Sequence, residues 1–210
     1  MLTESFSHQA AAHHIFAYDL ERTRRAHGLN QKEAAYAFGM QPWKYAKLID
    51  RNENVADTGI LMLFALYNDD GMPYSTFDLS VTPKNIVDSS PDERRSLFAA
   101  FYRDYFFMQD DSEYDQHTFG VLFHIPQGEV ASFLKPLDDG GTVPPAWLLI
   151  FLEAMQTFNS LEAGLQAAAT AVEKTFGRNQ CISYADLMCL QANIVRHVNE
   201  RLRIRAEEYA

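Results

Sequence analysis

Basic and aromatic side chains follow a glycine-containing break in the stretch LNQKEAAYAFGMQPWKYAKLIDRN, residues 29–52. Lys44, Lys47 and Arg51 are three and four positions apart, so on a helix they lie on adjacent turns and can approach phosphate groups. Trp43 precedes them, and an indole there can touch a thymine methyl group or pack on the sugar backbone. The alternative is a helical hairpin with solvated lysines and a tryptophan that covers an edge of the core. The spacing therefore raises the hypothesis of DNA binding and leaves this alternative open.

Catalytic and metal-binding patterns are absent from the sequence. It contains no GxSxG, Walker loop, HExxH or glycine-rich dinucleotide turn, and its histidines are scattered. The two cysteines, Cys181 and Cys189, lack CxxC spacing, which favours reduced thiols over a zinc site. The acidic stretch QDDSEYDQ lacks the glycine and the distal glutamate of a calcium loop, which favours a solvated connection. We therefore expect neither an enzyme nor a bound metal or cofactor.

Composition and charge limit the extent of any DNA contact. The 210 residues are 47% hydrophobic, enough for one large core or two small ones. No apolar run approaches the roughly 20 residues that span a bilayer, and the N-terminus lacks a secretory pattern, so we expect a cytoplasmic protein without a membrane partner. The formal net charge is -10, which counts against DNA binding over the whole surface. Any DNA contact must be local.

Helix start and stop signals predict an all-α fold. We expect a first helix over Ala10–Ala26, closed by Gly28 in the left-handed conformation. Two short helices follow on either side of Gly39. The apolar stretch Thr58–Tyr67 predicts the central helix of a small core, capped by Asp57. The inner face of the first helix is predicted to carry Ile15, Phe16, Leu20 and Thr23.

The remainder of the chain is also predicted to be helical. The segment 77–89 has little periodicity and predicts a linker, after which SPDE at 90–93 is a capping box that predicts a new helix. Near the C-terminus, apolar stripes predict one helix closed by Gly177 and a longer one over about 183–207. The longer helix is either a lid on its neighbours or a dimer seam, and we favour the seam. The stripe of the shorter helix comprises Leu161, Leu165, Ala168, Val172 and Phe176.

The pattern around Gln31 occurs a second time, 85 positions further along. Residues 30–49 set over 115–134 without a gap match large apolar residues with large ones and small residues with small ones. A two-residue insertion in the loop LDDGGTVPP then brings 59–64 over 146–151. Any two helix pairs share the helical period and can agree in part. Here the glutamine, the small residue, the break and the closing apolar helix all match in the same order, which favours two copies of one fold. The matched pairs are Gln31 with Gln116, Ala35 with Gly120, Phe38 with Phe123, Met40 with Ile125, Tyr45 with Val130, Ala46 with Ala131 and Leu48 with Phe133.

The first copy meets the demands of a helix-turn-helix. A small residue, here Ala35, lets the second helix cross the first closely, and a glycine, here Gly39, permits the turn. Residues 29–52 resemble the helix-turn-helix of the phage repressor and Cro family, also called XRE-like. The resemblance covers about 15–67, and the second copy, about 98–157, is a weaker match. The residues that carry it are GLNQ at 28–31, Ala35, Gly39, Tyr45 and Leu48.

In that family the helix after the turn lies in the major groove, and the glutamine that starts the preceding helix holds a phosphate. The resemblance therefore implies double-stranded DNA as the partner. Pro42 and Trp43 depart from the small or amide side chains that are common in the family, which weakens the case for base-specific contacts more than the case for DNA binding. The implied contacts are Gln31 with a phosphate, Gln41, Pro42, Trp43, Lys44 and Lys47 in the groove, and Arg51 beside the lysines near phosphates.

Charge separates the two copies. Residues 15–53 contain seven cations and five anions, a balance of +2. Residues 98–153 contain two cations and nine anions, a balance of -7, and Glu129 stands where the first copy has Lys44. A carboxylate at that position repels phosphates. We therefore expect the first copy to bind DNA and the second to be a structural or protein-binding unit.

These patterns predict a sequence-specific DNA-binding transcription regulator, made of two tandem repressor/Cro-like helix-turn-helix domains and a C-terminal helical hairpin. A homodimer is expected, or a protein partner bound through the second domain or the C-terminal helices, because readers of this family commonly need two half-sites. The alternative is a protein-binding regulator, such as an antiactivator, an antitoxin or a phage-encoded inhibitor, which would explain the acidity and the Pro42-Trp43 pair. The expected divisions are a DNA-binding domain over 1–76, a linker over 77–89, a second domain over 90–158 and C-terminal helices over 159–210.

Overall fold

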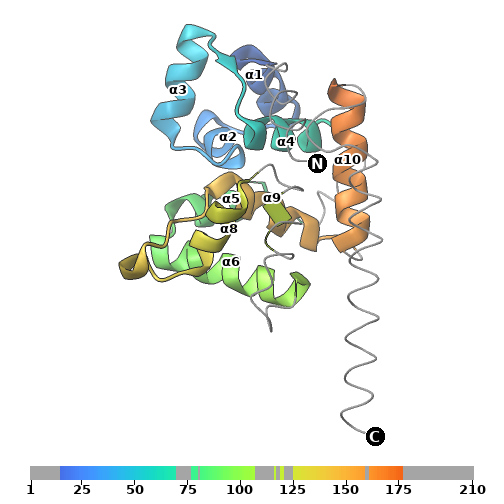
Figure 1. Ribbon diagram of the computed structural model, residues 1–210. Coiled ribbons are helices and arrows are strands. Elements are labelled where there is room, and N and C mark those ends of the chain that lie inside the picture. The colour runs from blue at the N-terminus through green and yellow to red at the C-terminus, as the bar shows by residue number, and fades with distance from the viewer. Residues whose placement is uncertain are drawn as a thin grey trace, which may run out of the picture.

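Helices account for nearly all regular structure in the described part of the chain, as the sequence predicts (Figure 1). The computed structural model describes residues 15–69, 77–79, 81–106, 116, 119–120, 125–158 and 161–176. We call 15–69 the first unit and 81–158 the second unit. None of the described helices combines the length and apolarity that a membrane crossing requires.

The first unit contains two short helices joined by a turn, with a further helix on either side of them. A short antiparallel ladder pairs Ile15 with Val55 and Phe16 with Asn54, and so joins the two ends of this arrangement. Asp57 caps the last helix through a bond from the Ile60 N–H to its carboxylate (3.2 Å), as predicted. The elements are β1 (Ile15–Phe16), α1 (Ala17–Ala26), α2 (Gln31–Ala37), α3 (Pro42–Arg51), β2 (Asn54–Val55) and α4 (Thr58–Tyr67).

The start of α1 differs from the prediction. Ile15 and Phe16 form a strand, so the helix begins at Ala17, and the predicted residues 10–14 lie outside the described part of the chain. Phe16 was expected on the inner face but is 48% exposed, because in a strand neighbouring side chains point to opposite faces and Ile15 takes the buried side. The Asp19 carboxylate accepts the Phe16 N–H (3.0 Å) and fixes this boundary.

The second unit begins with a helix where a linker was expected. Residues 82–88 form α5, and Pro83, Ile86 and Val87 are buried where α5 contacts α2 and α9. Two helical turns are too short to show periodicity in the sequence, which explains the wrong prediction. The capping box is confirmed, since Glu93 accepts the Ser90 N–H (2.7 Å). The elements are α5 (Thr82–Asp88), α6 (Pro91–Phe106), α8 (Gln127–Leu134), the 3-10 helix η2 (Leu137–Asp139) and α9 (Ala146–Gln156), followed by α10 (Leu161–Phe176).

One hydrophobic core runs through both units. Helices α4 and α9 contact each other, and α10 lies against both, as Figure 1 shows for the orange helix. The Lys174 ammonium pairs with the Asp69 carboxylate (2.6 Å) at the end of α4. The predicted stripe on α10 is confirmed at Leu165, Ala168 and Val172, which are each 1% exposed. This helix therefore covers the two units, whereas the predicted seam over 183–207 lies outside the described residues.

The proposed repeat has a counterpart in the backbone. Helices α3 and α8 begin at Pro42 and Gln127, which are 85 positions apart, the offset found in the sequence. Tyr45 and Val130, paired at that offset, are both fully buried. The two turns thus share local geometry. Three backbone bonds recur at this offset: Met40 to Ala35 (3.0 Å) with Ile125 to Gly120 (2.8 Å), Lys44 to Gln41 (2.9 Å) with Glu129 to Pro126 (2.8 Å), and Tyr45 to Gln41 (3.2 Å) with Val130 to Pro126 (3.1 Å).

Candidate nucleic-acid interface

Helix α3 forms an outer edge of the molecule, on the side away from α6 and α10 (Figure 1). Gln41 is its N-cap residue, and Pro42 occupies the first helical position, where the missing N–H costs no hydrogen bond. Asn52 ends the helix in the left-handed conformation, with a φ of 44°. Its side-chain oxygen accepts the Tyr18 N–H (3.2 Å), so the end of α3 is tied to the start of α1.

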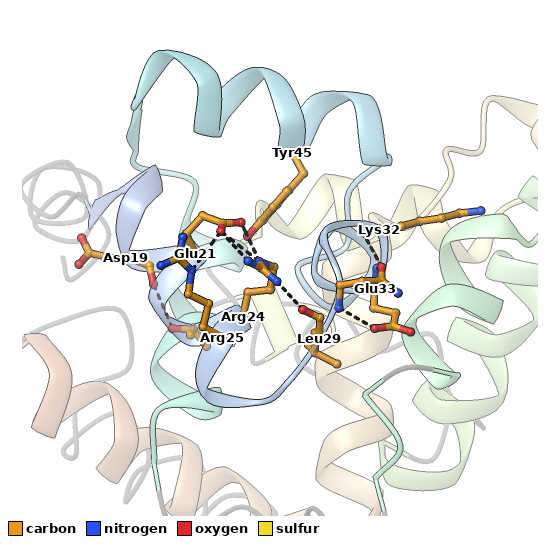
Figure 2. Close-up of polar contacts among 10 residues, drawn as sticks. Asp19, Glu21, Arg24, Arg25, Leu29, Lys32, Glu33 and Tyr45 are labelled. Atoms are coloured by element: carbon orange, nitrogen blue, oxygen red, sulfur yellow. Dashed lines mark hydrogen bonds and ion pairs between the residues drawn. The ribbon is translucent and has the colours of Figure 1, made fainter.

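Tyr45 anchors the inner side of α3. The side chain is fully buried, and its ring stacks on Phe38 with 6.5 Å between centroids. Its hydroxyl donates to a Glu21 carboxylate oxygen (3.0 Å) on α1, as Figure 2 shows. Burial, followed by the negative charge of Glu21, raises the pKa of Tyr45, so the hydroxyl remains a donor at neutral pH. A buried hydrogen bond to a charged group therefore fixes the rotation of α3 relative to α1.

Glu21 is the centre of this polar network. It is 5% exposed, and the Arg24 guanidinium donates to it through Nε (2.9 Å) and Nη2 (3.0 Å). Arg24 also donates to the Leu29 carbonyl (2.6 Å), which ties the network to the loop before α2. Burial alone would raise the pKa of Glu21, but the hydrogen bonds from Arg24 and Tyr45 and the charge of Arg25 outweigh it, and the pKa lies below its usual value. The carboxylate is thus charged and paired.

The outward face of α3 consists of Trp43, Lys44, Lys47, Asp50 and Arg51, all of which are exposed. It carries three cations and one anion. Trp43 is 63% exposed, and the Lys44 ammonium lies 5.7 Å from its ring centroid, a cation–π distance. The Arg51 guanidinium is 3.4 Å from the carboxylate of half-buried Glu53, a surface pair that water screens. This face is basic and exposed.

The other two predicted site residues on α3 lie at its start. Gln41 is exposed and accepts the Lys44 and Tyr45 N–H groups through its backbone carbonyl, which leaves its side chain outside the cap. Pro42 is partly buried, so it lies beside the outward face and not at its centre. Of the predicted groove-facing set, Pro42 is thus the least accessible.

Gln31 is the first residue of α2 and is exposed. Asn30 caps the helix by accepting the Lys32 and Glu33 N–H groups (2.9 and 3.0 Å), while Glu33 accepts the Asn30 N–H (2.7 Å). The cap leaves the Gln31 side chain outside these bonds. However, the Glu33 carboxylate adds a negative charge near the position where the resemblance implies a phosphate contact.

The corresponding helix of the second unit has the opposite charge. The sequence of α8, QGEVASFL, contains no cation, and Glu129 is exposed in its first turn. Asp138 and Asp139 are exposed in η2, which follows α8. On the inner side, Phe133 packs on Phe98 of α6 with 5.2 Å between ring centroids. This surface is unsuited to phosphates.

Among the described residues, no group of three or more His, Cys, Asp or Glu side chains could hold a metal ion. The cysteines and most of the acidic stretch at 109–116 lie outside them. His27 Nε2 is 2.7 Å from the Tyr67 carbonyl, which indicates a structural role for that histidine.

No family model, curated protein or solved structure matches this chain. The resemblance to repressor-type domains therefore depends on the residues and geometry described above.

Sequence reasoning missed the Glu21 network. A signal was present, because Ala17, Leu20, Glu21 and Arg24 follow the spacing of one helix face, and Ala17, Leu20 and Glu21 are buried. A glutamate and an arginine on such a face indicate a buried ion pair.

Proposed function

We propose that this protein is a sequence-specific DNA-binding transcription regulator that inserts α3 into the major groove. The observation that carries the proposal is the outward face of α3, which is exposed and basic on a protein of net charge -10. Its inner side is held by buried Tyr45, so the side chains that would meet DNA are presented by a rigid helix.

Each exposed residue has a role that follows from its chemistry. Lys44, Lys47 and Arg51 neutralise phosphates on the two sides of the groove, and Gln31 donates to a phosphate from the start of α2. Trp43 makes apolar contact with a thymine methyl group or with sugar. Trp43 therefore selects among DNA sequences through shape and apolar contact more than through hydrogen bonds.

The test compares the native protein with Lys44→Glu/Lys47→Glu. Duplexes are first selected from a random library and from the promoter region of the protein's own gene, and binding is then measured at two salt concentrations. Loss of two phosphate contacts should abolish binding at the higher salt and reduce the log–log salt slope by about 2. Lys84→Glu/Lys135→Glu is the matched control, because it changes the net charge equally at exposed positions of the second unit.

A second outcome points to another class of protein. If the native chain binds no duplex even at low salt, DNA binding is contradicted, and the outward face of α3 becomes a docking surface for an acidic protein. The exposed indole of Trp43 favours this alternative, since tryptophan and arginine are common among the residues that dominate binding at protein interfaces.

A further inference from the structure

Trp147 joins the second unit to the turn between α2 and α3. It lies in the first turn of α9, and its backbone approaches Gly39 so closely that a Cβ on that glycine would be 2.7 Å from the Trp147 nitrogen. Its indole lies flat on Gly59 in the first turn of α4, where a Cβ would overlap the ring. Two glycines of the first unit thus form the space that this residue fills.

Gly39 is the residue that sets the angle between α2 and α3. Its φ of +69° is left-handed, and its N–H donates to the Tyr36 carbonyl (2.8 Å). The next residue, Met40, donates to the Ala35 carbonyl (3.0 Å). Any movement of this turn would change the position of α3 relative to Gln31 at the other end of α2.

We propose that Trp147 is a positioning residue, through which the second unit holds the α2–α3 turn in the geometry that presents α3 to DNA. The inference rests on the proposed function and gives the acidic second unit a role in it. Trp147 belongs to an otherwise deeply buried helix in which residues 148–152 are at most 2% exposed, yet it is itself only partly buried. Its contacts with Gly39 and Gly59 place it between the units, apart from the centre of its own core.

Two substitutions separate positioning from ordinary packing. Trp147→Leu removes the indole from Gly59 and leaves only the backbone and Cβ of residue 147 to hold Gly39. Phe133→Leu instead removes an aromatic ring that packs on Phe98 within the second unit. A third variant, Gly59→Ala, forces a methyl group against the indole, and the pair Gly59→Ala/Trp147→Leu relieves that overlap. Because the chain has two tryptophans, Trp147→Leu also leaves Trp43 as its sole indole fluorophore, which reports contact with DNA.

The measurements are amide hydrogen exchange at Gly39 and Met40, and DNA affinity well below the midpoint of thermal unfolding. We expect Trp147→Leu to exchange faster at both amides and to bind roughly tenfold more weakly, with an unchanged salt slope because no phosphate contact is lost. Gly59→Ala should behave similarly, and the double variant should recover part of the affinity. Phe133→Leu should change the midpoint of unfolding without either effect.

The outcomes distinguish this inference from the proposed function. Unchanged exchange at the turn in Trp147→Leu overturns the inference, as does faster exchange with native DNA affinity. A native protein without DNA affinity contradicts the proposed function. Exchange at Gly39 and Met40 then still decides whether Trp147 holds the turn.

Discussion

The two units contain turns with the same backbone hydrogen bonds, but the exposed residues beside these turns have opposite charges. Around the turn of the first unit, Lys44 is exposed and Tyr45 is buried; at the matching positions of the second, Glu129 is exposed and Val130 is buried. The backbone hydrogen bonds of the two turns agree within 0.2 Å. Buried positions and backbone bonds therefore maintain the turn, while the exposed positions are free to differ in charge.

The buried side of the comparison also differs. Tyr45 anchors α3 through a polar bond to Glu21, whereas Val130 is buried without a side-chain polar group. A polar anchor depends on geometry more strictly than an apolar one does, because its donor and acceptor are costly to leave unpaired. The orientation of α3 is thus specified more narrowly than that of α8.

The largest expected effect comes from removing the polar anchor. Glu21→Leu leaves the Tyr45 hydroxyl without its acceptor and the Arg24 guanidinium without its paired charge, so the free energy of unfolding should fall by about 3 kcal/mol. Urea unfolding at pH 7 measures it. Glu129→Leu, at an exposed site of the second unit, should change the value by no more than about 0.5 kcal/mol. Equal effects of the two changes would contradict the assignment of Glu21 as a buried polar anchor of α3.

A smaller effect is expected from pH, with opposite signs in the two units. The pKa of Glu21 is lowered in the folded state, so it contributes stability at neutral pH that is lost as the pH falls from the ordinary glutamate pKa through the lower folded-state pKa. Burial raises the pKa of Glu153 on α9, so its contribution is unfavourable at neutral pH and is relieved as the pH falls. Glu153→Gln should therefore stabilise the protein slightly at pH 7. Glu21→Gln should destabilise it and reduce the loss of unfolding free energy as the pH falls. Unfolding curves between pH 7 and pH 3 that show the same sign for both variants would contradict this assignment.

The smallest expected effect tests whether the second unit touches DNA. Glu129→Lys places a cation where α8 corresponds to Lys44 of α3. If α8 is remote from the duplex, affinity should change less than about twofold at moderate salt, because exposed charges beyond a Debye length are screened. A large gain in affinity with a steeper salt slope would mean that both turns approach DNA.

Much of the first unit was predictable because its signals are local. The cap at Asp57, the left-handed Gly28 and the exposure of Lys44 and Lys47 follow from residue type and helical spacing. Helix α5 was not, because two turns give too few positions for a period to appear.

The contacts of Trp147 were unpredictable for a different reason. They join residues about a hundred positions apart, and a sequence pattern does not specify which helices meet across a core. Similarly, the strand at residues 15–16 depends on its distant partner β2.

The burial of helix α4 links the stability of the two units. Every residue over 61–67 is at most 5% exposed, because α1 covers it from the first unit while α9 and α10 cover it from beyond. A core shared in this way favours unfolding of the two units in a single cooperative transition. Proteolytic cleavage between the two units would therefore release a fragment with a bare apolar helix, prone to aggregation, and would not liberate an independently folded first unit.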